Sequence, residues 1–481
     1  MPLELKKIKA SSKKIGFFRF KELNKNYLLT NDVGFYVFLT QSQFKNFVEG
    51  KLDKESAIYK ELKEKGFTKD LSVAEKEKLI NLYRSKNFSL FRPGPSLHIV
   101  VLTLRCNFKC VYCQAASELP SKKEYDMTLN TARQTVDYIF KTPVRSFTIE
   151  FQGGEPLINW PALKFIVEYA RKKSEAEGKD LNISLVSNLT LMTDEKLRFL
   201  MKNRVDICTS LDGPEELHNK NRPWVKGNGY KKTTYWIRRI KEKFLKEEAS
   251  RRPALSALIT VSRNSLKYPK EIIEEYLKWG FPGVHLRPLT YLGFAKAPGN
   301  KISYSAEEFM AFWKRAMDYI ISLNEDGIFF QEREAKIILQ KILTSADPGY
   351  TDLMSPCGAA LGQIAYNYNG DIYTCDEGRM FRDDTFLIGN VRKNGYRETI
   401  LNNKVKTMLT SSCLENTACD YCAYKPYCGV CPVRNYIYYG NLFPQMKNTD
   451  WCKIKTAQFD YIFDKMKNEK TREIFERWVS A

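Results

Sequence analysis

The placement of its cysteines constrains this chain more than any other feature of the sequence. Of the 481 residues, 12 are cysteines, and none of them precedes residue 106. Cys106, Cys110 and Cys113 fall within eight residues, and a further eight cysteines run from Cys357 to Cys452. Thiols gathered in this way form either a disulfide framework or ligands for a metal. The fold must therefore bring two separate sets of thiols into position.

The rest of the composition favours metal over disulfides. Met1 to Lys7 carries charges where a secretion signal needs an apolar stretch, and no run of about 18 apolar residues is present. We therefore expect a cytoplasmic protein without a membrane span. Clustered thiols in a reducing compartment more often bind metal than form disulfides. The chain has only three histidines, which disfavours a metal site built from histidine.

The spacing of the first set favours iron over zinc. Cys106-x3-Cys110-x2-Cys113 supplies three thiolates and no nearby histidine, which suits an iron-sulfur cubane with one iron free of protein ligands. The late set contains a block that, read alone, would also fit a zinc ribbon: Cys419-x2-Cys422-x5-Cys428-x2-Cys431.

The length predicts two or three domains, the first of them small. Residues 17–39 alternate in short apolar runs with a turn signal at 31–34, which predicts a three-stranded meander. Helical patterns follow at 41–48, 54–65 and 73–86. We expect a β+α, winged-helix-like domain over residues 1–97, because Pro93 and Pro95 then interrupt regular structure.

From residue 98 the pattern becomes strand, loop, helix, repeated. Such repeats predict an α/β fold with a parallel sheet, here a partial (β/α)6 TIM-type barrel over 98–324, with functional groups at the carboxyl ends of its strands. The cysteine triplet follows the first strand and Gly153-Gly154-Glu155-Pro156 follows the second, so both should face the same mouth. Residues 325–481 read as a cysteine-rich domain with a final helix near 456–479. The expected strands are 98–104, 147–151, 183–186, 205–211, 255–261 and 284–287.

The triplet and the Gly-Gly-Glu-Pro phrase, in this order, resemble the radical SAM enzymes. The resemblance implies that the three thiolates hold a [4Fe-4S] cluster whose fourth iron binds S-adenosylmethionine, and that Tyr112 packs near the adenine. It further implies that Gly153, Gly154 and Glu155 bind the amine of this cofactor. Ser187-Asn188 matches a ribose-binding phrase, although Leu189 replaces the usual glycine after it.

The late cysteines resemble the SPASM extension of peptide-modifying radical SAM enzymes. The phrase Gly370-x4-Cys375 and the later cysteine block carry this resemblance, although the last spacing of the block is one residue short. The resemblance implies two auxiliary [4Fe-4S] clusters, and therefore three clusters in all. The implied sets are Cys357, Cys375, Cys413 and Cys431 for the first, and Cys419, Cys422, Cys428 and Cys452 for the second. Cys208 is left over, and we expect it to be a small buried apolar residue.

Two acidic residues are candidates for catalysis. Asp212 lies in Ser210-Leu-Asp-Gly-Pro214, a phrase common in SPASM enzymes, and is predicted either to face the substrate or to cap the next turn. Asp376 directly follows Cys375, where similar sulfatase maturases carry an acid proposed to take a proton from the substrate radical. A plain turn residue is the alternative for Asp376.

The first domain resembles the leader-peptide recognition element fused to many peptide maturases. Residues 1–97 carry 20 basic and 11 acidic side chains, a net +9 that would suit an acidic leader bound by strand addition. A winged helix for DNA is the alternative. Much of the chain also resembles the His-Xaa-Ser system maturases, in Arg92-Pro-Gly-Pro-Ser-Leu-His98, Leu104-Arg-Cys106 and Glu150-Phe-Gln-Gly-Gly-Glu155.

Together these patterns predict an enzyme that abstracts a hydrogen from a ribosomally made precursor peptide and installs a crosslink or another oxidative change. An external one-electron donor of the flavodoxin or ferredoxin type is implied. The alternatives are modification of a protein, as in sulfatase maturases, or of nucleic acid, which the net charge of +21 would attract. A plain iron-sulfur electron carrier is a third alternative, which would not cleave S-adenosylmethionine.

Overall fold

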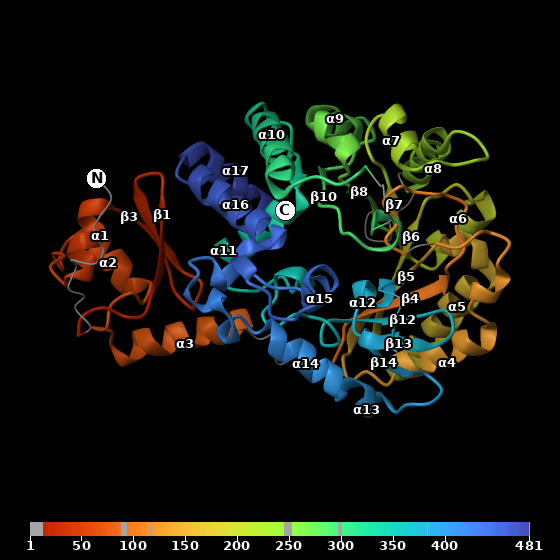
Figure 1. Ribbon diagram of the computed structural model, residues 1–481, viewed down its shortest axis with the longest axis horizontal. Coiled ribbons are helices and arrows are strands. Elements are labelled where there is room, and N and C mark those ends of the chain that lie inside the picture. Colours follow the sequence, from red (N-terminus) through yellow and green to blue (C-terminus); the bar gives the residue numbers. More distant parts are fainter. Residues whose placement is uncertain are drawn as a thin grey trace.

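The computed structural model describes residues 13–87, 94–115, 117–244, 253–296, 301–381 and 383–480. Figure 1 shows an elongated molecule in which an N-terminal unit, at the left, joins a larger body made by the rest of the chain. The predicted break at Pro93 lies outside the described residues. None of the described helices is both long enough and apolar enough to cross a bilayer.

The N-terminal unit confirms the predicted three strands followed by three helices. Its antiparallel sheet has the order β1-β2-β3. A tight turn at Asn24 and Lys25, both with positive φ, joins β1 to β2, whereas the sequence predicted only the later turn. The elements are β1 (Arg19–Leu23), β2 (Asn26–Thr30), β3 (Tyr36–Thr40), α1 (Gln41–Val48), α2 (Ala57–Glu64) and α3 (Val73–Asn87).

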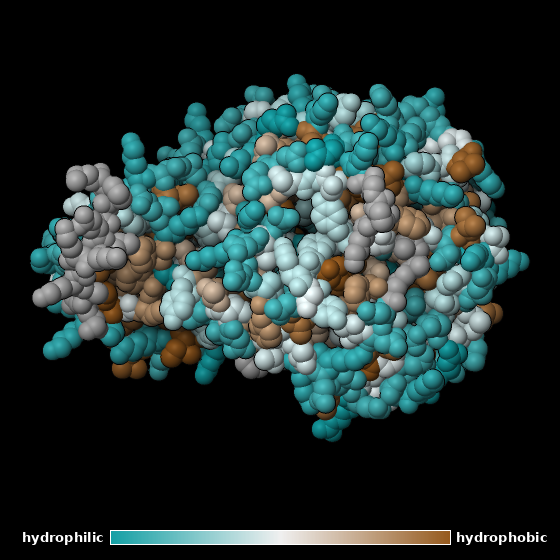
Figure 2. Space-filling view, in the orientation of Figure 1, coloured by the Kyte–Doolittle hydropathy of each residue, from teal (hydrophilic) through white to brown (hydrophobic). Residues whose placement is uncertain are grey.

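The two faces of this small sheet pack on different partners. One face forms a core with α1 and α2, in which Leu39, Phe44 and Phe47 are buried. On the other face, the ring of Tyr36 lies 5.3 Å from that of Phe463 in the C-terminal region. The third helix differs, because α3 buries none of its residues and leaves Val73, Ile80 and Tyr83 exposed. Brown apolar patches appear over this part of the surface in Figure 2.

The central body is built on the predicted parallel sheet. Six strands follow the order β10-β8-β7-β6-β5-β4 and pair in parallel, and intervening helices cover them (Figure 1). The α/β fold class is therefore confirmed, and the sheet is open rather than closed. The elements are β4 (Leu97–Thr103), α4 (Leu129–Ile139), β5 (Ser146–Gly153), α5 (Trp160–Glu177), β6 (Asp180–Ser187), α6 (Asp194–Lys202), β7 (Val205–Ser210), α7 (Glu215–Asn221), α8 (Gly229–Phe244), β8 (Leu255–Thr260), α9 (Pro269–Lys278), β9 (Gly283–Val284) and β10 (Leu286–Arg287).

The cysteine-rich region extends the same sheet, which the sequence did not predict. β12 pairs in parallel with β4, and β13 and β14 follow in antiparallel order, so the sheet has nine strands. The expected single final helix is two helices, broken at 466–468. The elements are α10 (Ala306–Glu325), β11 (Gln331–Glu332), α11 (Arg333–Leu343), β12 (Gln363–Tyr366), β13 (Asp371–Tyr373), α12 (Asp376–Met380), β14 (Leu387–Asn390), α13 (Tyr396–Ile400), α14 (Asn403–Ser412), α15 (Pro432–Tyr439), α16 (Asp450–Lys465) and α17 (Glu469–Ser480).

Candidate functional site

A cavity of about 180 Å³ lies where the predicted motifs converge, beyond the carboxyl ends of the parallel strands. It unites predicted residues from Cys106 to Asn188, which lie far apart in the sequence. Ser210, Arg222, Thr260 and Met380 also line it. The predicted residues that line the cavity are Cys106, Cys110, Tyr112, Cys113, Gly153, Gly154, Glu155, Ser187 and Asn188.

The cysteine triplet sits on a loop that backbone hydrogen bonds hold against a distant segment. The amides of Lys109 and Val111 donate to the carbonyls of Pro223 and Asn221, at 3.0 and 2.9 Å. Burial raises the pKa of the Cys110 thiol to about 12, partly opposed by the nearby Arg222, and burial also raises the pKa of Cys106. Buried thiolates here would need a strong cationic partner, and a triplet of thiols around an open cavity suits an iron-sulfur cluster.

Gly153 and Gly154 allow a close approach between two backbone segments beside the cavity. A Cβ on Gly154 would lie 2.1 Å from the carbonyl oxygen of Arg105, and one on Gly153 would lie 2.2 Å from that of Thr103. The amide of Gly154 donates to the Thr103 carbonyl at 2.9 Å. These glycines therefore let the end of β5 press against the chain that leads into the triplet.

Glu155 ties the ends of two strands together. Its carboxylate accepts hydrogen bonds from the Ser187 hydroxyl at 2.7 Å and from the Asn188 amide at 2.8 Å. Burial raises the pKa of this carboxyl, and the hydrogen bonds oppose the shift. The hydrogen bond between Ser187 and Glu155 thus holds both side chains in the cavity wall. The Asn188 side chain donates to Asn107 on the triplet loop at 2.9 Å, which adds Asn107 to the site.

Leu189 stands where the resemblance implies a glycine. Its φ of 62° lies in the left-handed region that favours glycine. Its side chain is fully buried in the core. The substitution therefore keeps the expected turn and adds apolar packing.

Asp212, predicted either to face the substrate or to cap the next turn, is not among the residues that line the cavity. Its side chain is fully buried and accepts hydrogen bonds from the Tyr112 hydroxyl at 2.6 and 2.8 Å. Arg222 also donates to that hydroxyl at 2.8 Å and lies 3.8 Å from the carboxylate. Burial raises the pKa of Asp212, and Arg222 opposes the shift. Asp212 is therefore placed to hold Tyr112 and Arg222, which do line the cavity.

Asp376 lies at the start of α12, close to the cavity but not among its lining residues. Arg379 donates to its carboxylate at 2.8 and 3.1 Å, and the side chain is 13% exposed. Met380, at the other end of this short helix, does line the cavity. α12 therefore brings the C-terminal region to the cavity.

The late cysteines lie in one buried apolar cluster and around two cavities. Cys357, Cys375 and Cys431 share the cluster, where burial raises the pKa of Cys375 and the neighbouring Glu377 adds to the shift. Cys413 lies outside that cluster and lines a cavity of about 280 Å³, which Cys428 also lines. The second predicted set stays together around a small cavity: Cys419, Cys422, Cys428 and Cys452.

Two further observations concern metal ligands. Cys208 is only partly buried in β7, whereas the sequence predicted a buried residue. Across the described stretches of the chain, no three side chains of His, Cys, Asp or Glu converge as ligands of a single metal ion. Each late group instead lines a cavity or shares an apolar cluster.

Known proteins are similar to this chain in sequence and in fold. Residues 100–255 match the family model of the radical SAM superfamily. A cysteine-type anaerobic sulfatase-maturating enzyme of Clostridium perfringens is 25% identical over 345 residues, which cover 70% of this chain and 88% of the relative.

Solved structures extend the likeness to the whole fold. The structure of anSMEcpe with bound AdoMet superposes with a TM-score of 0.65 at 20% identity, covering 78% of this chain and 99% of that one. The structure of Streptococcus suis SuiB bound to the precursor peptide SuiA has a TM-score of 0.51 at 12% identity, covering 90% and 97%. These neighbours show the radical SAM fold with additional domains. The chain is thus an enzyme, and its residues 100–255 are similar to the radical SAM superfamily.

Proposed function

We propose that this enzyme is a maturase that removes a hydrogen atom from a ribosomally made precursor peptide and installs a crosslink or another oxidative change. The observation that carries the proposal is the cavity in which the cysteine triplet, the Gly-Gly-Glu segment and Asn188 converge beneath Met380 of the cysteine-rich region. A similar fold occurs in an enzyme solved with its precursor peptide. The His-Xaa-Ser system resemblance supports a precursor of that class.

The proposed cofactors are S-adenosylmethionine and three [4Fe-4S] clusters. The triplet would hold the first cluster, with Tyr112, Gly153, Gly154, Glu155, Ser187 and Asn188 around S-adenosylmethionine. When bound there, this pair supplies the one-electron chemistry that removes an unactivated hydrogen atom. The late cysteines would hold the other two clusters, with Cys357, Cys375, Cys413 and Cys431 as one set and Cys419, Cys422, Cys428 and Cys452 as the other.

The protein's own residues would position these groups and handle a proton. Asp212 holds Tyr112 and Arg222 in place, so it acts through them rather than on the substrate. Asp376 is proposed to accept a proton from the substrate, because its helix reaches the cavity mouth at Met380. A flavodoxin-type or ferredoxin-type protein is the proposed electron donor, and residues 1–97 are proposed to bind the leader.

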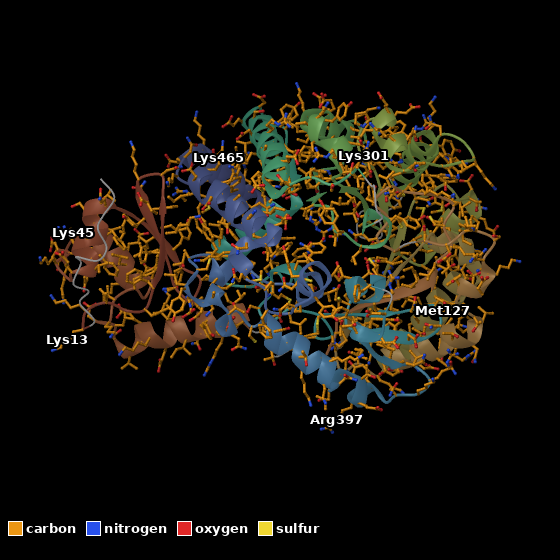
Figure 3. All side chains as sticks on the ribbon, viewed as in Figure 1. Lys13, Lys45, Met127, Lys301, Arg397 and Lys465 are labelled. Atoms are coloured by element: carbon orange, nitrogen blue, oxygen red, sulfur yellow. The ribbon has the colours of Figure 1, made fainter. Side chains whose placement is uncertain are left out.

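A protein and a nucleic acid are the two alternative substrate classes. A protein substrate, as in the sulfatase-maturating relatives, is the second candidate. A nucleic acid is the third candidate, because the net charge of +21 would attract phosphates. Figure 3 labels basic residues both on the N-terminal unit and on the larger body, among them Lys45, Lys301 and Arg397.

The test is co-expression with precursor peptides, followed by mass spectrometry of the peptide. We expect a loss of two hydrogens, or another defined oxidative change, in a peptide with His-Xaa-Ser repeats. Asp376→Asn should leave reductive cleavage of S-adenosylmethionine intact while lowering peptide modification by about 10²-fold or more, in the range of a lost acid-base group. Asp384→Asn, at an exposed residue nearby, is the matched control. Modification of a sulfatase-derived peptide alone would favour the second candidate.

A further inference from the structure

A buried ion pair lies beside the second cysteine group, which consists of Cys419, Cys422, Cys428 and Cys452. Lys455 of α16 pairs with Glu334 of α11, and their side chains are 1% and 4% exposed. Lys455 follows Cys452 by three residues, so the two side chains lie on the same face of α16. Lys455 lines the small cavity of this cysteine group, and Glu334 is not among the lining residues. The positive end of the pair therefore faces the cysteines.

Two neighbouring side chains hold the Lys455 ammonium in this position. It donates to the Gln458 amide oxygen at 3.0 Å, and the Gln458 amide nitrogen donates to the Glu334 carboxylate at 3.2 Å. The ammonium also lies 4.4 Å from the ring centre of Trp451, whose Nε1 donates to the Gly429 carbonyl at 2.9 Å. The charged head group is therefore fixed between α11 and the cavity.

Stability alone does not explain why this buried position carries charge. Removing two charges from water is costly, and apolar side chains of similar volume often stabilise a protein equally well or better. The location of the cation beside four thiols points instead to an electrostatic role at the cysteine group.

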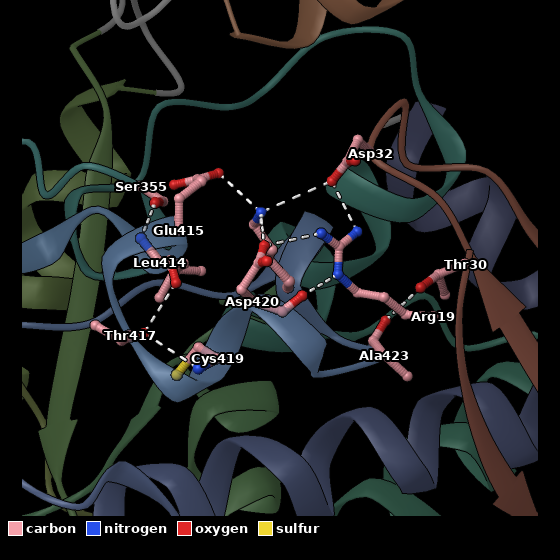
Figure 4. A network of polar contacts seen from close by, with 11 residues as sticks. Arg19, Thr30, Asp32, Ser355, Leu414, Glu415, Thr417, Cys419, Asp420 and Ala423 are labelled. Carbon is pink, nitrogen blue, oxygen red and sulfur yellow. Dashed lines mark hydrogen bonds and ion pairs between the residues drawn. The ribbon is translucent and has the colours of Figure 1, made fainter. Parts of the chain in front are cut away.

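Lys455 differs from the other charged side chain among the described residues of the cavity lining, which is Lys425. Lys425 is surrounded by three carboxylates, which Figure 4 shows converging: Asp32, Glu415 and Asp420. Within the part of the chain that the structure describes, Lys455 pairs with Glu334 alone. Most of the remaining lining is apolar: Leu414, Val430, Met446, Trp451 and Phe459. A charge acts more strongly in such surroundings than in water.

We propose that Lys455 raises the reduction potential of the [4Fe-4S] cluster assigned to the second cysteine group. The inference rests on the proposed function, because it concerns one of the proposed cofactors. Reduction adds one electron, and so one negative charge, to a cluster, and a cation that faces the cluster stabilises the reduced form. A higher potential would make this cluster a better acceptor for the electron that an oxidative change releases.

The experiment is a redox titration of the anaerobically reconstituted full-length enzyme, followed by electron paramagnetic resonance. The signal of the second cluster is the one that Cys428→Ala removes. Two double variants change the pair without leaving one buried charge alone. Lys455→Gln with Glu334→Gln removes both charges, and Lys455→Glu with Glu334→Lys exchanges them. Lys465→Gln is the matched control, at a partly exposed lysine of α16 that pairs with Asp318.

We expect the potential of the second cluster to decrease from the parent to the neutral pair and again to the exchanged pair. The neutral pair should lower the ratio of reduced to oxidised cluster about tenfold at a given potential, which is about 59 mV for one electron. The exchanged pair should lower it further, because a carboxylate then faces the cysteines. Lys465→Gln should keep the parent potential, because water and salt screen a surface charge.

Unchanged potentials in both double variants would overturn the inference. Equal shifts in the two would also overturn it, because they would show that only the packing of the pair matters. If the exchanged pair binds no iron, the neutral pair decides alone. If Cys428→Ala removes no signal, both the inference and the second auxiliary cluster of the proposed function fail. If the potentials follow the expected order but no precursor peptide is modified, the proposed substrate fails and the inference stands.

Discussion

The two cysteine regions of this enzyme are built in opposite ways. The triplet lies within eight residues of a single loop, and the loop is fixed by its position after β4. The eight late cysteines span nearly a hundred residues and come together only because strands, helices and turns pack around them. A compact motif can therefore be identified from its spacing, whereas the grouping of dispersed ligands depends on the tertiary structure.

The largest expected effect comes from removing one cysteine of the triplet, which should abolish cofactor cleavage without affecting the late cysteines. Cys110→Ala should reduce reductive formation of 5'-deoxyadenosine by more than about 10³-fold, because the triplet would no longer hold its cluster. The late groups should still bind about eight iron per chain after anaerobic reconstitution. Cys208→Ala, a cysteine outside all groups, is the control. Cleavage that persists in Cys110→Ala would mean that the radical-generating site lies elsewhere.

The next prediction tests the grouping of the late cysteines. Cys431→Ala should lower the iron content by about four per chain, since it removes a member of the buried group with Cys357 and Cys375. Cys413→Ala should lower the iron content by a similar amount, because Cys413 is the fourth proposed ligand of the same cluster, although it lines a different cavity. Iron analysis with electron paramagnetic resonance of the reduced protein measures both. A much smaller loss for Cys413→Ala would remove Cys413 from the set.

A third prediction concerns the packing beneath the triplet. Gly154→Ala places a Cβ against the Arg105 carbonyl, so the chain leading into Cys106 must shift. A displacement of about 1 Å at a reacting site costs roughly 10²-fold in rate, and we expect a loss of this size in S-adenosylmethionine cleavage. Gly395→Ala, where a Cβ would meet no neighbour, is the matched control. Wild-type cleavage by Gly154→Ala would contradict the tight contact.

The smallest expected effect comes from the polar group behind the cavity. Tyr112→Phe removes a hydroxyl that donates to Asp212 and accepts from Arg222, and it leaves both buried charges with one partner fewer. We expect the KM for S-adenosylmethionine to rise about tenfold and the free energy of unfolding to fall by about 1–3 kcal/mol. Kinetics and thermal melting would measure these changes, with Tyr235→Phe as control. An unchanged KM with lowered stability would make the hydroxyl purely structural.

Deletion of the N-terminal unit is a poor test of its role, because the unit packs against the C-terminal region. Removing it would expose Phe463, which packs against Tyr36, and would break the pairing of Arg19 with Asp420. A truncated enzyme could then lose peptide modification because α16 and the second cysteine group are disturbed. Point substitutions at exposed residues of the N-terminal unit keep these contacts. A loss of peptide modification in such variants would then report on the unit itself.

Much of the fold could be predicted because the periodicity is local. The strands that became β4 to β8 were visible as short apolar runs separated by helical patterns, and the three strands of the N-terminal unit alternated clearly. The addition of β12 to the parallel sheet was not visible, since Gln363–Tyr366 is short and its partner, β4, lies more than 250 residues earlier. Pairing at such distance leaves no periodic signal in either segment.

The candidate site shows the same contrast between features that are local in the sequence and contacts between distant segments. The sequence by itself determined which residues are candidates for the chemistry, because thiol type, spacing and the phrase Gly153-Gly154-Glu155 are local properties of the chain. Only the tertiary structure decided that Asp212 is buried and bonded to Tyr112, that Cys413 lies outside the buried cluster of Cys431, and that Arg19 of β1 pairs with Asp420. These outcomes depend on burial and on contacts between distant segments, which packing sets and spacing along the chain does not encode.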